Sequence, residues 1–193
     1  GKGKQMVRVS GQEERHVIEF RNVSFRYPNT ERMVLKNVSL TISDGEKLAV
    51  VGRNGAGKST FIKLLCRLYE PTEGKILYNG TDISTICYAD YVRLLSVVFQ
   101  DYRLFAFSVK DNMVLNQEYD ASKAEEAVRK SGLQKKIDTL PQGIDTSVGR
   151  EFDENGIEFS GGEGQKLVMA RAYYRDAPIV ILDDESFLAY CRQ

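Results

Sequence analysis

The sequence predicts an α/β fold, and three stretches carry that prediction. A glycine-rich segment, Gly52–Thr60, lies between an apolar run at 48–51 and a helical pattern at 61–66. Alternating apolar and polar residues at 16–27 predict half-buried strand structure upstream of it. A continuous apolar run at 179–182 is typical of a parallel strand that is buried on both faces. With 193 residues, the chain is long enough to bury a core of its own.

The glycine-rich segment fits the pattern G-x-x-x-x-G-K-[ST] in the context of strand, loop and helix that this motif requires. Glycine permits the positive φ angles at which successive N–H groups point at one anion. The start of the helix adds about half a positive charge. Lys58 is expected to reach the β and γ phosphates, and the Ser59 hydroxyl to face Mg²⁺. The predicted phosphate-binding residues are Gly52, Asn54, Gly55, Ala56, Gly57, Lys58, Ser59 and Thr60.

The residues before the apolar run at 48–51 predict a small antiparallel sheet, and further strands are expected after the phosphate loop. Pro28-Asn29-Thr30 ends the first strands, and Asn79-Gly80 predicts a hairpin because both residues tolerate positive φ. We expect strands, in chain order, at 16–20, 23–27, 34–42, 75–78 and 96–99.

The middle of the chain predicts helices from about 109 to 140, with Asp120 capping one helix and Gly132 closing it. The polar stretch from Pro141 to Asn155 predicts a surface loop. Ser160 and Glu163 have the spacing of a capping box, so a further helix is expected to start there.

Composition counts against some classes of partner. Lys plus Arg equals Asp plus Glu at 27 each, so no net charge favours nucleic acid or a membrane surface. No apolar run approaches the length of a membrane span and no signal peptide is present, which predicts a soluble chain that is not secreted. Three widely spaced cysteines give no zinc pattern and fit a reducing compartment.

Asp183 directly follows the apolar run at 179–182. The carboxyl end of a buried strand is where α/β sheets bind ligands. In P-loop enzymes an aspartate there completes the Mg²⁺ site together with the hydroxyl of the loop. The sequence therefore predicts a Mg²⁺ site that contains Ser59 and Asp183.

With these motifs in place, the chain from about Val17 to Asp184 resembles the nucleotide-binding domain of ATP-binding cassette (ABC) transporters. Ser160-Gly161-Gly162-Glu163 resembles the signature motif of the family, Leu-Ser-Gly-Gly-Gln, with Phe159 in place of the leucine and Glu163 in place of the glutamine. The stretch from Phe99 to Asn112 and the X-loop-like Val148-Gly149-Arg150-Glu151 are similar to exporters.

The resemblance implies roles for further residues. Tyr27 corresponds to the A-loop aromatic that stacks on adenine. Gln100 corresponds to the Q-loop glutamine, which binds Mg²⁺ and couples to the membrane domain. Asp184 stands at the position of the catalytic glutamate. Each ATP is expected to lie between the phosphate loop of one chain and residues of a second chain in a head-to-tail pair. The residues of that second chain are Ser160, Gly161, Gly162 and Glu163.

The implied fold is a P-loop NTPase (RecA-like) core with an N-terminal antiparallel β-subdomain and an inserted α-helical subdomain. The run at 179–182 corresponds to the Walker B strand of the family. The C-terminal part of the core is expected to be missing, since the chain departs from the family just after this strand. The domains expected are a linker at 1–15 from an upstream membrane domain, the β-subdomain and P-loop core at 16–100, the helical subdomain with the signature motif at 101–165, and a return to the core with a divergent tail at 166–193.

The expected function is an ATPase that drives export through a membrane domain at the cytoplasmic face of the plasma (inner) membrane. Asp184 is one methylene shorter than glutamate, and a displacement of about 1 Å in a positioned base costs on the order of a hundredfold in rate. Glu185 is an alternative base. The only histidine is His16, so no switch histidine is present in these residues.

Three other interpretations stay open. The first is a nucleotide-binding module with little or no turnover, favoured by Asp184 and the missing histidine. The second is a soluble ABC protein of DNA repair or translation, against which the balanced charge counts. The third is a small-molecule P-loop kinase, which leaves the signature-like Ser160-Gly161-Gly162-Glu163 unexplained.

Overall fold

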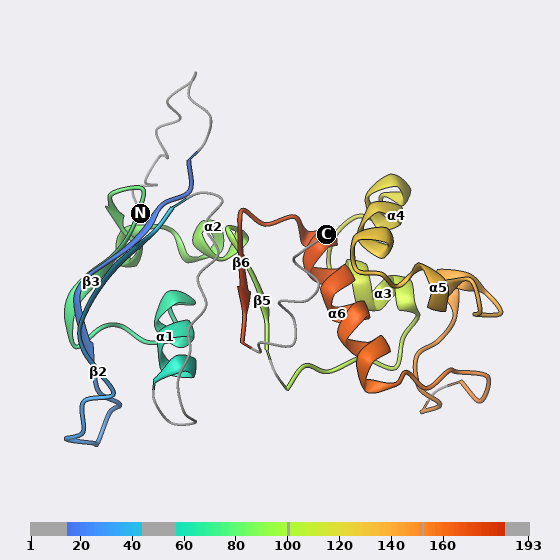
Figure 1. Cartoon of the computed structure of the whole chain (residues 1–193), viewed down its shortest axis with the longest axis horizontal. Coiled ribbons are helices and arrows are strands. Elements are labelled where there is room, and N and C mark those ends of the chain that lie inside the picture. Colours follow the sequence, from blue (N-terminus) through green and yellow to red (C-terminus); the bar gives the residue numbers. More distant parts are fainter. Residues whose placement is uncertain (1–14, 44–56, 100, 152, 184–193) are drawn as a thin grey trace. The chain divides into compact units, whose positions relative to one another are not determined.

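The computed structural model describes residues 15–43, 57–99, 101–151 and 153–183 (Figure 1). The chain divides into two compact units, residues 1–95 and 96–193. The first unit is built on an antiparallel sheet with the strand order β2-β1-β3-β4. Its strands are β1 (Ile18–Phe25), β2 (Leu35–Ile42), β3 (Glu73–Tyr78) and β4 (Thr81–Asp82). The predicted antiparallel sheet is therefore confirmed.

The two strands predicted at 16–20 and 23–27 form one irregular strand, β1. Its pairing register shifts between Phe20 and Val23, and Asn22 has a φ of +49°. A bulge of this kind moves the alternation of buried side chains by one position, so Phe20 and Val23 both face the core. Gly74 lies against the bulge, where a Cβ would come within 2.3 Å of the Arg21 carbonyl oxygen.

The predicted Asn79-Gly80 hairpin is also confirmed. Asn79 and Gly80 have φ angles of +47° and +78°, and the turn joins β3 to β4 with Tyr78 opposite Thr81. Positive φ at both central residues is the requirement of a two-residue type I′ turn.

The helices of the first unit are α1 (Lys58–Leu65), a short 3₁₀ helix η1 (Ile83–Thr85) and α2 (Tyr88–Arg93). Phe61 of α1 stacks on Phe20 of β1 with ring centroids 4.5 Å apart. The buried Tyr91 of α2 donates a 2.7 Å hydrogen bond to the Leu65 carbonyl at the end of α1. Burial raises the pKa of the Tyr91 phenol well above its usual value, so it remains a donor. These contacts hold α1 against the sheet and against α2.

The second unit is organised around its longest helix, α6 (Gly161–Arg175), against which α3 and α4 pack (Figure 1). Its other elements are β5 (Leu95–Val98), which begins at the last residue of the first unit, α3 (Val109–Val114), α4 (Ala121–Lys130), α5 (Gln134–Ile137), the 3₁₀ helix η2 (Gly143–Asp145) and β6 (Ile179–Leu182).

The predicted ends of α4 are confirmed. The Asp120 carboxylate accepts from the Lys123 N–H at 2.9 Å, and Gly132 follows the helix with a φ of +70°. The fully buried Leu167 and Ala170 of α6 face Met113 of α3 and Val128 of α4 in one apolar cluster.

One expectation for the second unit is refined and one is corrected. The described residues from Pro141 to Asn155 are exposed or half-buried, as a surface loop should be, except that Thr146 and Val148 are buried and that the stretch contains η2. Backbone bridges join 147 to 108 and 148 to 157. The run at 179–182 does form β6, but Val180 is 48% exposed. In the part of the chain that the structure describes, β6 pairs only with β5. Among the described residues, no helix combines the length and apolar character that crossing a membrane requires.

Candidate nucleotide-binding site

The predicted site residues that the structure describes fall into two groups, one in each unit. The first unit holds Tyr27 and the run Gly57–Thr60, and the second holds the run Ser160–Glu163 together with Asp183. The predictions for Gly52, Asn54, Gly55, Ala56, Gln100 and Asp184 lie outside the described residues.

Gly57 is the N-cap of α1 and has a φ of +96°. A Cβ at this position would lie 2.9 Å from Leu35 Cδ2 and 3.3 Å from the Val34 carbonyl oxygen, so both backbone angle and space favour glycine. Lys58 and Ser59 follow in the first turn, Lys58 half-buried and Ser59 exposed. The first turn has no acidic residue, and its N–H groups have no partner within the helix. This end of α1 is suited to an anion.

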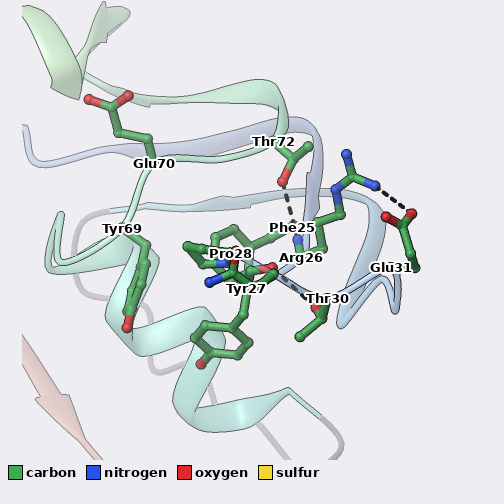
Figure 2. A pocket seen from close by; sticks show the side chains of 10 residues that line it. Phe25, Arg26, Tyr27, Pro28, Thr30, Glu31, Tyr69, Glu70 and Thr72 are labelled. Carbon is green, nitrogen blue, oxygen red and sulfur yellow. Dashed lines mark hydrogen bonds and ion pairs between the residues drawn. The ribbon is translucent and has the colours of Figure 1, made fainter.

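Tyr27 lies just beyond the end of β1, and its hydroxyl is 2.9 Å from the Thr60 hydroxyl in the first turn of α1. The Thr60 side chain is buried, while Tyr27 is half-buried. Phe25 and Tyr69 meet the Tyr27 ring edge to face, with centroids 5.0 and 5.2 Å away, and Figure 2 shows these rings beside α1. The Lys63 ammonium lies 5.6 Å from the centre of the Tyr27 ring.

A hollow of about 400 Å³ opens beside these rings. Figure 2 shows the Thr72 hydroxyl accepting from the Arg26 N–H and the Arg26 guanidinium paired with Glu31, at 3.2 Å in each case. Aromatic walls with a few polar groups are typical of a site for a planar ring. Its lining residues are Phe25, Arg26, Tyr27, Pro28, Asn29, Thr30, Glu31, Tyr69, Glu70 and Thr72.

Sequence reasoning did not find Tyr69 or Lys63. Lys63 lies five residues after Lys58 on the predicted helix, and Tyr69 lies two before Pro71, so each had only a local signal. Their contact with Tyr27 depends on how α1 packs against β1, which spacing along the chain does not specify.

Ser160 caps α6, and the predicted capping box is confirmed. The Ser160 hydroxyl accepts from the Glu163 N–H at 3.3 Å, and the Glu163 carboxylate accepts from the Ser160 N–H at 2.9 Å. The Ser160 N–H bond and, after it, the hydrogen bond from Lys136 hold the pKa of Glu163 below its usual value. Ser160, Gly161 and Gly162 are exposed, so the start of α6 is open to solvent.

Tyr102 contacts the same first turn of α6 and was also missed. Its hydroxyl donates a 2.9 Å hydrogen bond to the Gly161 carbonyl, and a Cβ on the buried Gly164 would lie 2.9 Å from that hydroxyl. The absence of a side chain at Gly164 therefore admits the phenol. The signal in the sequence was a glycine inside a predicted helix, which usually has a packing reason.

A second hollow, of about 430 Å³, lies in the second unit between β5, the segment after it and α6. Exposed apolar side chains line it, among them Phe99, Phe105 and Leu115, together with the basic Arg171. Arg171 donates to the Asn112 carbonyl at 2.7 Å, its guanidinium lies 5.6 Å from the centre of the Phe105 ring, and burial lowers its pKa. The fully buried Asn112 side chain accepts from the Phe105 N–H and donates to the Phe105 carbonyl, both at 2.8 Å. These bonds hold the backbone of Phe105 at the edge of the hollow.

Asp183 follows β6 directly, where its N–H donates to the Val98 carbonyl at 2.9 Å. Hydroxyl, amide and carboxylate oxygens are the donors that Mg²⁺ prefers, so Ser59, Gln100 and Asp183 are a chemically suitable set. Within the described ranges no group of three or more His, Cys, Asp or Glu side chains forms a metal site by itself.

The family model described as "ABC transporter" matches residues 35–186 of this sequence. The chain belongs to the ABC transporter family. This confirms the predicted family, and with it the P-loop NTPase fold with an N-terminal antiparallel sheet and helices.

Relatives of this ABC chain are exporter proteins. It is 40% identical to the ATP-dependent lipid A-core flippase of Pseudomonas aeruginosa over 179 residues. These aligned residues make up 92% of this chain and 28% of the flippase. The subtilin transport ATP-binding protein SpaT of Bacillus subtilis is 40% identical over 177 residues, and the alignment covers 89% of this chain and 28% of SpaT. The structure of a bacterial Atm1-family ABC exporter with ATP bound superposes with a TM-score of 0.79 at 34% sequence identity. The superposition covers 91% of this chain and 30% of the exporter chain. The chain thus spans less than a third of the length of these relatives.

Proposed function

We propose that this ABC chain binds ATP with Mg²⁺ and hydrolyses it as a head-to-tail pair to drive export through a membrane domain. The contact between Tyr27 and Thr60 carries the proposal, because it holds an aromatic ring beside the first turn of the helix that contains Lys58. A ring for the base and an anion-binding helix start for the phosphates are the two halves of a nucleotide site.

The roles proposed for single residues follow from their chemistry. Lys58 and the N–H groups of the first turn of α1 bind the β and γ phosphates, and Tyr27 stacks on adenine. Ser59, Gln100 and Asp183 would hold Mg²⁺, which would offset charge on the phosphates. Asp184 orients the attacking water.

The pairing proposal is supported by the exposure of the signature-like turn. The cap hydroxyl of Ser160 and the backbone of Gly161 and Gly162 are exposed, and they begin a 15-residue helix. A helix start with free N–H groups can bind the γ phosphate of a nucleotide held by a second copy. In the pair, each chain supplies one half of two sites.

ATP binding and phosphate release, measured side by side on the full chain and on Lys58→Ala, test the proposal. Binding and turnover that both require Lys58 support an ATPase. Binding that requires Lys58 without phosphate release supports the alternative of a nucleotide-binding module, with Asp184 too short to position the water. Binding that is unchanged by Lys58→Ala would refute the site.

We further propose that the second hollow docks the membrane domain, which places the chain at the cytoplasmic face of the plasma (inner) membrane. The exposed Phe99, Phe105 and Leu115 form the kind of apolar surface that marks protein interfaces. Phe105→Asp should abolish co-purification with the membrane domain of the transporter. Phe107 is even more exposed but does not line the hollow, so Phe107→Asp is the matched control. Equal loss in both variants would contradict this surface.

A further inference from the structure

Lys136 of α5 contacts both positions at which the signature-like motif departs from its usual residues. Its ammonium lies 3.0 Å from the Glu163 carboxylate, which stands where the motif has glutamine. The same ammonium lies 5.2 Å from the centre of the Phe159 ring, which stands where the motif has leucine. The Lys136 ammonium thus contacts the side chains of both Glu163 and Phe159.

This ion pair differs from the surface ion pairs of the chain. The side chains of Lys136 and Glu163 are 19% and 30% exposed, whereas Lys130 and Glu126, paired at 2.8 Å on α4, are 47% and 54% exposed. Exposed ion pairs such as Lys130–Glu126 contribute little to stability, because water and salt screen them. The Lys136 pair is less screened, and it joins two helices.

The charge of Glu163 bears directly on anion binding at the start of α6. Its carboxylate accepts from the Ser160 N–H, so a negative group already lies against the backbone donors of this turn. A glutamine could complete the same capping box without charge. A phosphate that approaches the Ser160 hydroxyl would therefore be repelled by Glu163 unless a cation offsets it.

We propose that Lys136 is a positioning residue that holds the Glu163 side chain in the capping box and offsets its charge, so that the first turn of α6 can bind the γ phosphate of a nucleotide on the paired chain. The inference rests on the proposed head-to-tail pair. Lys136 acts through Glu163 and does not itself contact the phosphate.

The test measures pairing and nucleotide binding separately on the full chain. Pairing is followed by sedimentation velocity with Mg²⁺ and either the non-hydrolysable analogue AMP-PNP or ADP, and binding by the fluorescence of mant-ATP. The variants are Lys136→Met, Lys136→Arg and the double variant Lys136→Met/Glu163→Gln. Lys130→Met, which breaks an ion pair of similar length on α4, is the matched control.

We expect Lys136→Met to weaken pairing with AMP-PNP about tenfold, which corresponds to about 1.4 kcal/mol, and to leave mant-ATP binding unchanged. Lys136→Arg and the double variant should restore pairing to within about twofold of the original chain, since one keeps the positive charge and the other removes the negative one. The loss in Lys136→Met should shrink at high salt. Lys130→Met should pair normally.

Rescue by Glu163→Gln separates a charge effect from misfolding, because a chain that cannot fold would not recover pairing when a second residue is changed. Normal pairing of Lys136→Met, or a double variant as weak as Lys136→Met, would overturn the role of Lys136 and leave the proposed function standing. An original chain that binds mant-ATP but never pairs would overturn the head-to-tail arrangement and the inference with it. Failure to bind mant-ATP would refute the nucleotide site itself.

Discussion

Replacing Gly164 by alanine tests the contact between Tyr102 and the first turn of α6. Alanine favours a helix interior over glycine by about 1 kcal/mol. Against this, the new Cβ would lie 2.9 Å from the Tyr102 hydroxyl and 3.5 Å from Leu104 Cδ1. Overpacking costs about 1–3 kcal/mol, and loss of the hydrogen bond to the Gly161 carbonyl adds about 0.5–1.5 kcal/mol. The packing terms exceed the propensity gain, so we expect Gly164→Ala to lower the free energy of unfolding by about 2 kcal/mol.

Urea unfolding, followed by circular dichroism, measures this change in the free energy of unfolding. The same substitution made in a second variant, Tyr102→Ala, shows whether the change depends on the phenol. In a Tyr102→Ala chain the phenol is gone, so Gly164→Ala should there raise the free energy of unfolding by up to about 1 kcal/mol. Gly162→Ala is the control in the same turn, because its Cβ would meet nothing within 4 Å. A Gly164→Ala chain that is stabilised equally in both backgrounds would refute the contact.

Three further predictions concern buried polar groups and the nucleotide site. Asn112→Ala should lower the free energy of unfolding by about 1–3 kcal/mol in the same urea assay, because the backbone N–H and carbonyl of Phe105 lose the partner that the fully buried Asn112 side chain supplies; a loss below about 0.5 kcal/mol would contradict this. The folded-state pKa of Glu163 is lowered from 4.5, so its contribution to stability is present above about pH 4.5 and is lost as the pH falls through the folded-state pKa. The stability difference between the original chain and Glu163→Gln should therefore shrink as the pH falls below about 4.5, in melting curves recorded from about pH 7 downward, and a difference that stays constant would exclude the carboxylate as its source. Tyr27→Phe removes the bond to Thr60 and should weaken mant-ATP binding about threefold to tenfold, while an unchanged affinity would show that the hydroxyl does not orient the ring.

The sequence by itself determined the features that depend on neighbours in the chain. Asp120 and Ser160 cap helices because their side chains reach N–H groups three residues ahead. The Asn79-Gly80 hairpin forms because both residues accept positive φ. The same holds for the glycine-rich pattern and for the order of motifs that predicted the ABC family, since each motif is contiguous. The irregularity in β1 was not predicted, because a bulge changes the alternation without leaving the strand.

Only the tertiary structure decided which of these pieces touch. Tyr27 meets Thr60 across 33 positions, and Tyr102 meets Gly161 across 59. Lys136 of α5 meets Glu163 in the first turn of α6, although η2 separates the two helices along the chain. Periodicity shows which face of an element is buried, but not which neighbour covers it or at what height along the axis. Each of these contacts joins residues that are distant in the sequence, so local patterns along the chain do not specify it and it appears only once the chain is folded.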